Sequence, residues 1–296
     1  MTDQLRKTTM ETTLDLADNK PALAARLMAY PLVRIVLGVV LTFAAVPLAM
    51  IIASQLVAKP YRVMWPQLLA AVLVWFGYRF WVRRVEKRQP TELAMPGMAR
   101  ELGAGLLVGG WLVALTFALL AALGAYQFGG INAVGIMMLV PLAELVLVGF
   151  AEEMMFRGVV FGVTERSLGA KAAVVISALV FSLAHMPNQG VSVLAMAVIA
   201  AYGVLQAALY MVTRRLWVCI GTHIAWNYCV SQVFSSTVSG HAATDGLLRG
   251  ELVGNSLLTG GVFGVEGSLV ALVLIATAAA LCLRKAFAGK SVSLGS

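Results

Sequence analysis

The stretch AEEMMFRGVV, residues 151–160, places two glutamates and an arginine inside an otherwise apolar segment. A charged side chain at the centre of a bilayer costs about 2.5–3.5 kcal/mol on insertion scales. Glu152, Glu153 and Arg157 therefore need partners in the folded protein. Charged residues in such a position indicate a functional site by default, so these three are the first candidate site residues.

The composition around this stretch predicts a polytopic membrane protein. The chain of 296 residues is 60% hydrophobic and 12% charged, with a mean hydropathy of +0.87. Soluble domains are about 45–50% apolar and about 25% charged. A net charge of +8 would suggest nucleic acid in a soluble protein, but here the basic residues lie between apolar runs, as topology signals and contacts for anionic headgroups. We expect membrane lipids as partners and no nucleic acid.

Eight apolar runs are long enough to span a bilayer, which needs about 17–25 residues of helix. The predicted fold is therefore all-α, a bundle of about eight transmembrane helices with a polar site in its core. The predicted spans are residues 30–55, 64–82, 102–126, 132–157, 171–187, 191–212, 216–236 and 267–283. We divide the chain into a cytoplasmic tail (1–29), two N-terminal helices with a cytoplasmic loop (30–100), a catalytic core (101–236), and an outer loop, last helix and cytoplasmic tail (237–296).

The positive-inside rule fixes the orientation of this bundle. One set of helix ends carries most of the basic residues: Arg6, Lys7, Lys20, Arg26, Arg83, Arg84, Lys87, Arg88, Arg100, Arg166, Lys171, Arg214, Arg215, Arg284, Lys285 and Lys290. The opposite ends carry Lys59, Arg62 and Arg249. We expect both termini in the cytoplasm. The Ala- and Val-rich composition is typical of a bacterial protein, so we expect a bacterial plasma membrane.

A short set of polar residues remains inside the predicted spans: Glu144, Glu152, Glu153, Arg157, His185, Gln206, His223 and Asn227. Glu152 precedes Arg166 by 14 residues and His185 follows Lys171 by 14. At the rise of an α-helix each lies about 21 Å from its basic anchor, and His223 and Asn227 lie about 12 and 18 Å from theirs. Polar groups from three helices can therefore meet.

Helical phase adds detail to this set. Glu153 and Arg157 are four residues apart, so the carboxylate can neutralise the guanidinium on one face. Glu152 is rotated by about 100° from Glu153 and can point elsewhere. His223 and Asn227 share a face, and Phe181 lies one turn before His185. A carboxylate with an imidazole can activate a water, and an imidazole with a carboxamide can stabilise an oxyanion, which together are the needs of peptide hydrolysis.

These residues resemble the CPBP intramembrane proteases, the family that includes the Rce1-type CAAX prenyl endopeptidases and the bacterial Abi proteins. EEMMFR matches the family's EExxxR motif, FSLAH (181–185) its FxxxH motif and HIAWN (223–227) its HxxxN motif. The resemblance covers about residues 100–235. It implies that Glu152 activates water with help from His185, that His223 and Asn227 stabilise the oxyanion, and that Glu153, Arg157 and Phe181 support them.

The cofactor requirement stays open at this point. Glu152, His185 and His223 could bind Zn²⁺, as in a metalloprotease, although the same groups can work as a metal-free base and oxyanion hole, which we favour. The three cysteines lie in apolar segments without metal-ligand spacing and predict neither a disulfide frame nor a thiolate site.

The sequence therefore predicts an intramembrane endopeptidase that cleaves a peptide or membrane-protein substrate near the cytoplasmic side. The HExxH and GxGD motifs of other intramembrane proteases are not found. Alternatives are a proton-coupled transporter that uses Glu152 and His185, a non-catalytic scaffold or immunity protein, and haem ligation by His185 and His223. Each residue also has a structural interpretation, such as a buried ion pair for Glu153 and Arg157 or an interhelical hydrogen bond for either histidine.

Overall fold

A computed structural model describes residues 23–133, 135–242 and 245–292, so most of the predicted N-terminal tail lies outside the described residues. All eight predicted spans are helical. They correspond to α3 (Pro31–Phe43) with α4 (Ala45–Leu56), α5 (Trp65–Arg84), α6 (Met98–Ala122), α7 (Val140–Glu153), α9 (Ala170–Ala184), α10 (Val193–Thr213), α11 (Leu216–Tyr228) and α13 (Leu269–Val292). Shorter helices are α2 (Leu23–Ala29), α8 (Gly162–Leu168) and α12 (Ser256–Thr259). The protein is an all-α membrane protein, as predicted.

Four helices within the described ranges are long and apolar enough to cross a membrane: Pro31–Leu56, Met98–Ala122, Val193–Thr213 and Leu269–Ala288. The other predicted spans are shorter or more polar. Helix α7 has 14 residues and ends with Glu152 and Glu153, α5 carries Arg79, Arg83 and Arg84, and α9 has only 15 residues. The spans that miss the length and composition test are therefore mainly those that build the polar interior.

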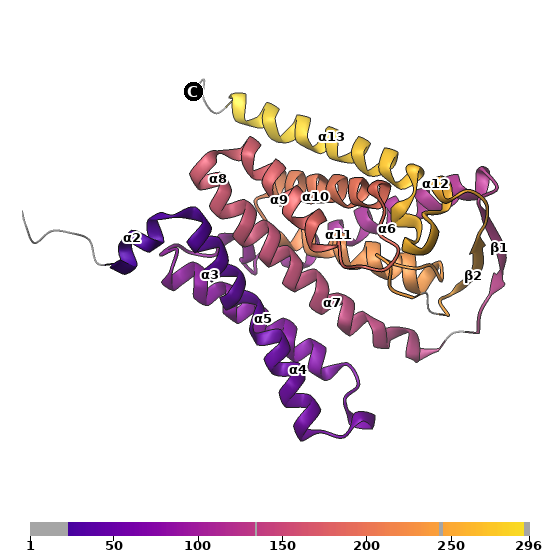
Figure 1. The fold of residues 1–296 in the computed structure, drawn as a ribbon, viewed down its shortest axis with the longest axis horizontal. Helices are drawn as coiled ribbons and strands as arrows, with labels where there is room; N and C mark the ends of the chain where they lie inside the picture. The colour runs from indigo at the N-terminus through magenta and orange to yellow at the C-terminus, as the bar shows by residue number, and fades with distance from the viewer. Residues whose placement is uncertain (1–22, 134, 243–244, 293–296) are drawn as a thin grey trace, which may run out of the picture.

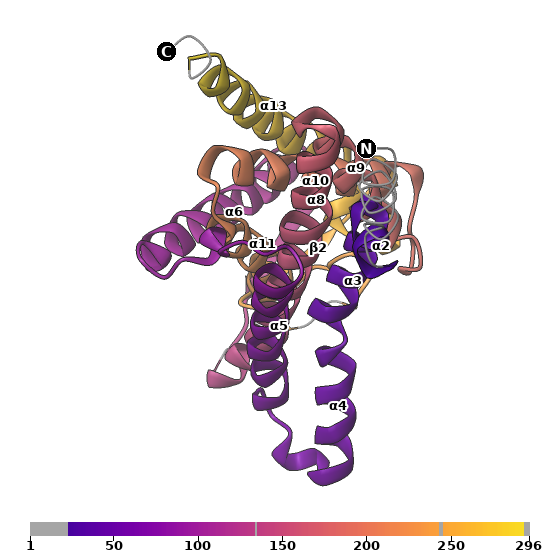
Figure 2. The same ribbon diagram turned by 90° about the vertical axis from the view of Figure 1, so that its left-hand side faces the viewer.

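The helices run between two distinct ends of the molecule (Figure 1). One end holds α8 and the C-terminal part of α13, and the other holds α12 and a two-stranded sheet. In that sheet β1 (Tyr126–Ile131) pairs antiparallel with β2 (Leu248–Leu252), with an irregularity between Phe128 and Gly130. The sheet was not predicted, since β2 lies in the predicted outer loop. Helix α4 and the adjoining part of α5 project away from the other helices in both views (Figure 2).

Close approach of α6 and α11 positions the candidate site. Gly105 and Gly109 of α6 face α11, where a Cβ on either would collide with the carbonyl oxygen of Val218 or Thr222. Gly221 of α11 faces α6 in the same way. Small residues that let two backbones approach closely are the typical interface of membrane helices. This contact fixes the depth and rotation of α11, which carries His223 two residues beyond Gly221.

A π-helical segment, Met154–Phe161, continues α7 directly after its two glutamates and leads into α8. The predicted span ends at residue 157, but the helical path continues to Leu168. Single π turns inside α-helices are rare and occur often at functional sites. Gly158 in this segment lies against the ring of Tyr78 of α5, which leaves no room for a side chain there. The wide turn thus lies between Glu153 and the basic turn at Arg166.

Candidate functional site

A cavity of about 420 Å³ lies between α7, α9, α10 and α11, and residues of the 234–268 segment line it as well. Its lining includes Glu152, His185, His223 and Asn227. The structure therefore brings together all four residues that the sequence assigned to catalysis. Phe181 also lines the cavity, whereas Glu153 and Arg157 lie outside its lining.

Glu153 is the centre of a buried hydrogen-bond network. Its side chain has no exposed surface, and its Oε1 accepts from Arg157 Nη1 at 3.0 Å, Gln206 Nε2 at 3.1 Å and His223 Nδ1 at 2.7 Å. The ion pair expected from the four-residue spacing is therefore present. Because the ionised carboxylate can only accept, His223 Nδ1 must carry the proton of that bond. Glu153 thereby fixes the orientation of the imidazole and leaves Nε2 directed elsewhere.

The buried guanidinium of Arg157 has polar and aromatic partners inside the apolar bundle. It is 1% exposed, and besides Glu153 it donates to the Gly203 carbonyl oxygen at 3.4 Å. Its Cζ lies 4.5 Å from the centre of the Phe181 ring, within the range of a cation–π contact. Breaking such a buried pair by removing one partner typically costs about 3–5 kcal/mol. Glu153 and Arg157 are therefore paired with each other, and their side chains also contact α9, α10 and α11.

Glu152 has a different environment, although it precedes Glu153 by one residue. Its side chain is 24% exposed and faces the cavity, and its Oε2 lies 3.8 Å from His223 Nε2. That oxygen is buried and has no hydrogen-bond partner among the described residues. A separation above 3.5 Å between two polar atoms is one that a water molecule can bridge. His223 therefore lies between the two glutamates, with one ring nitrogen toward each.

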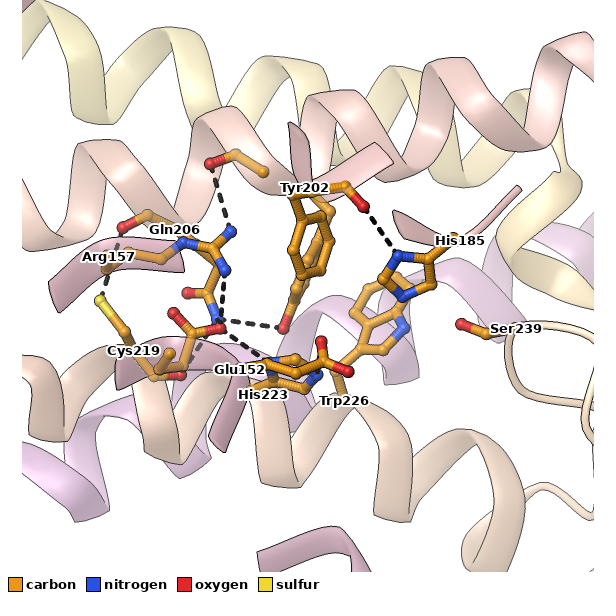
Figure 3. Close-up of polar contacts among 12 residues, drawn as sticks. Glu152, Arg157, His185, Tyr202, Gln206, Cys219, His223, Trp226 and Ser239 are labelled. Atoms are coloured by element: carbon orange, nitrogen blue, oxygen red, sulfur yellow. Dashed lines mark hydrogen bonds and ion pairs between the residues drawn. The ribbon is translucent and has the colours of Figure 1, made fainter. Parts of the chain in front are cut away.

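His185 ends α9 on the other wall of the cavity. Its Nδ1 lies 2.8 Å from the carbonyl oxygen of Phe181, one turn earlier, and since a carbonyl oxygen only accepts, Nδ1 carries the proton. The ring packs on the Phe181 ring with centroids 4.7 Å apart, as the spacing predicted. Figure 3 shows Glu152 and His185 bordering the same space. The Nε2 of His185 is left as the nitrogen available to a ligand.

The residues around His223 complete the site. Asn227 follows it by one turn of α11 and is 9% exposed at the cavity wall. Tyr202 of α10 packs edge-on against the His223 ring at 5.8 Å, and Trp226 packs on Tyr202. The indole Nε1 of Trp226 donates to Glu266 Oε1 at 2.6 Å, while Glu266 Oε2 accepts from the Ser239 hydroxyl at 2.7 Å. The outer-loop segment is thus tied to the helix that carries His223.

A three-ligand metal site does not fit this arrangement. Among the described residues, no group of three His, Cys, Asp or Glu side chains is close enough to hold one ion. His223 Nε2 and Glu152 Oε2 face each other, but His185 does not join them in such a group. A zinc site in proteins typically has at least three protein ligands. We therefore derive no step through a metal.

Sequence reasoning missed several residues of the site. Gln206, which the sequence left without a role, is fully buried and joins Glu153 to the Cys219 carbonyl oxygen, to which its Nε2 donates at 3.0 Å. Glu144, also without an assigned role, is exposed at the cavity, as is His241. Glu266, Ser239 and the Trp226 bond were not expected. The signal for Gln206 was its amide in a predicted span; no pattern indicated the partners of Glu266.

A comparison with known families matches the central part of the chain. Residues 134–229 match the family described as Type II CAAX prenyl endopeptidase Rce1-like. The match includes the EEMMFR, FSLAH and HIAWN segments and hence every residue of the predicted catalytic set. The family resemblance predicted from these motifs is confirmed. A search of curated proteins found no match to the chain.

Proposed function

We propose that this chain, whose central segment is Rce1-like, is an intramembrane endopeptidase with a water activated by Glu152. The observation that carries the proposal is the position of His223 between Glu153 at 2.7 Å and Glu152 at 3.8 Å, in the wall of a cavity shared with His185 and Asn227. This arrangement combines a half-buried carboxylate, a fixed imidazole and a carboxamide, which suits acyl transfer to water.

The proposed reaction begins with a water held by Glu152 and His185. The Glu152 carboxylate takes one proton while the water oxygen attacks the peptide carbonyl carbon, and His185 Nε2 orients the water by accepting its other proton in a hydrogen bond. The carbonyl oxygen becomes an oxyanion. General bases of this kind contribute typically about 10²–10⁴-fold to rate.

His223 and Asn227 stabilise that oxyanion in the proposal. A proton on His223 Nε2 requires the imidazolium form, which the Glu153 carboxylate at Nδ1 supports in the way an acid orients a catalytic histidine. The Asn227 amide supplies a second donor. When the C–N bond breaks, Glu152 returns its proton to the leaving amine, so the products are a carboxylic acid and an amine.

The proposal also covers the setting of the enzyme. The protein is an integral membrane protein whose residues 134–229 match the Rce1-like family; we propose a bacterial plasma membrane, both termini cytoplasmic and a catalytic core of residues 101–236. Lipids and a peptide or membrane-protein substrate are the proposed partners. The sequence favoured cleavage near the cytoplasmic side. The residues that line the cavity provide separate evidence about the side from which a substrate enters.

A cleavage assay tests the proposal. Purified protein in detergent is incubated with a quenched-fluorescent peptide library, beside Glu152→Gln and His223→Ala variants. We expect release of fluorescence by the wild type and a loss of at least 100-fold in either variant. Equal cleavage by wild type and Glu152→Gln would refute the assigned base. Cleavage products are identified by mass spectrometry, which excludes a contaminating protease if the cut site is absent in both variants.

A further inference from the structure

The two ends of the helix bundle differ in charge. The turns that join α5 to α6, α8 to α9 and α10 to α11 lie at one end and are bound to each other: Arg166 pairs with Glu86, Arg214 with Glu165 and Arg215 with Glu101. This basic end carries Arg83, Arg84, Lys87, Arg88, Arg100, Arg166, Lys171, Arg214 and Arg215. By the positive-inside rule it faces the cytoplasm.

The opposite end, which we call the loop end, comprises the described residues of the ranges 57–64, 123–139 and 234–268 and carries the sheet. Its basic residues within the described chain are Lys59, Arg62 and Arg249. Arg249 is used within the sheet, where it donates to the Gly129 carbonyl oxygen at 2.9 Å. The loop end therefore has the charge expected of a non-cytoplasmic face.

The cavity lies between the helices and extends to the loop end. Its lining includes Asn188 just after α9, then Val238, Ser239 and His241 of the outer loop, and Glu266 before α13. The described residues that line it include none from the three turns of the basic end. The Asn188 amide donates to the Ser239 carbonyl oxygen at 2.9 Å, so the loop is fixed at the cavity and forms part of its wall.

Exposure along α7 and its surroundings shows which way the cavity opens. Glu144, two turns nearer the loop end than Glu152, is exposed and lines the cavity, as is His241. Glu152 itself is half-buried, and Glu153 and Arg157 beyond it are fully buried. Figure 3 shows Arg157, Gln206 and Cys219 on one side of Tyr202, and His185 and Ser239 on the other. The Glu153–Arg157–Gln206 network therefore closes the cavity toward the basic end.

We infer that the cavity receives its substrate from the non-cytoplasmic side of the membrane. That the substrate is a polypeptide rests on the proposed function; the side rests on charge and lining alone. The helix rise agrees with this side. Glu152 lies about 21 Å from Arg166, which places it past the middle of a hydrocarbon core about 30 Å thick and nearer the non-cytoplasmic face. This inference replaces the cytoplasmic-side cleavage expected from the sequence, which did not include the outer loop in the site. The substrate class is a peptide segment exposed outside the cytoplasm.

Sided labelling with a membrane-impermeant maleimide tests the inference without any substrate. The variants are Ala242→Cys at the cavity mouth and Leu168→Cys at the basic end, both at exposed positions. Wild type is the blank for the native cysteines. We expect Ala242→Cys to be labelled in right-side-out vesicles at least tenfold faster than in inverted vesicles, and Leu168→Cys to show the opposite. Labelling of Ala242→Cys from the cytoplasmic side, or only after detergent is added, would overturn the inference.

A second assay separates this inference from the proposed function. Wild-type protein in right-side-out and inverted vesicles receives membrane-impermeant quenched peptides that the detergent assay has shown to be cleaved. We expect cleavage in right-side-out vesicles only, and cleavage in inverted vesicles only would overturn the inference. If no peptide is cleaved even in detergent, the protease proposal fails while the labelling result still decides the side.

Discussion

Glu152 and Glu153 are adjacent and identical in type, yet the fold gives them different environments. Glu153 is fully buried and accepts from Arg157, Gln206 and His223. Glu152 is 24% exposed at a cavity and approaches the other nitrogen of His223 at 3.8 Å. One step of about 100° around the helix axis separates them. The difference teaches that two equal residues of one motif can divide into one that is held in a buried network and one that faces a cavity.

The largest expected effect is the loss of cleavage rate when Glu152, the proposed base, is replaced. Glu152→Gln keeps the size of the side chain and removes the base, so we expect the single-turnover cleavage rate to fall by about 10²–10⁴-fold. Unfolding in a denaturing detergent titration should stay close to wild type, because the described residues give Glu152 Oε2 no hydrogen bond to lose. A large loss of stability in this variant would break the comparison.

Replacement of Glu153, which positions His223, should change both the stability of the protein and the cleavage rate. Glu153→Leu leaves the buried Arg157 without its acid and should destabilise the protein by about 3–5 kcal/mol. Adding Arg157→Met removes the unpaired charge and should restore most of that stability. The cleavage rate of the double variant should stay at least tenfold low, because His223 Nδ1 has lost its acceptor. Recovery of rate together with stability would reduce Glu153 to a structural ion-pair partner.

A smaller effect on substrate binding is expected from the hydrogen bond that ties α11, the helix of His223, to the outer loop. Trp226→Phe keeps a ring against Tyr202 and removes the donor to Glu266, a hydrogen bond to a charged group worth about 1.5–3 kcal/mol. Because Ser239 still holds Glu266, we expect a KM increase of a few-fold with little change in kcat. Trp217→Phe is the matched control, since its indole donates to the Ala94 carbonyl oxygen at the basic end. Equal KM changes in both variants would contradict a role of the loop in substrate binding.

The smallest expected effect is that of chelation. Since no three suitable side chains gather around one point within the described residues, treatment with a strong zinc chelator should leave the cleavage rate unchanged within about twofold. The measurement is the initial rate before and after chelation and after added Zn²⁺. Loss of activity that zinc restores would mean that Glu152 is a metal ligand, and the contrast with Glu153 would need a new explanation.

The sequence predicted the helices because helices depend on local signals, and the candidate residues that it named lie around one cavity. Apolar runs of spanning length fix where helices form, and the spacing of Glu153 with Arg157 fixes a shared face. The π-helical segment, the Gln206 bond and the approach of α6 to α11 depend on how helices pack. Glu266 could not be assigned, since its partners Trp226 and Ser239 are 40 and 27 residues away in the chain. The side of the membrane toward which the cavity opens could not be predicted for the same reason, because it depends on the packing of the same outer loop.

The division between the two glutamates is tested most directly at His223 itself. In protein with ¹⁵N-labelled histidine, reconstituted in lipid nanodiscs, the Nδ1 proton bonded to Glu153 should give a strongly downfield resonance, assigned by its loss in His223→Gln. We expect Glu152→Gln to keep that resonance and Glu153→Leu/Arg157→Met to lose it. A resonance that survives in the double variant and disappears in Glu152→Gln would contradict the assignment of Glu153 as the residue that positions His223.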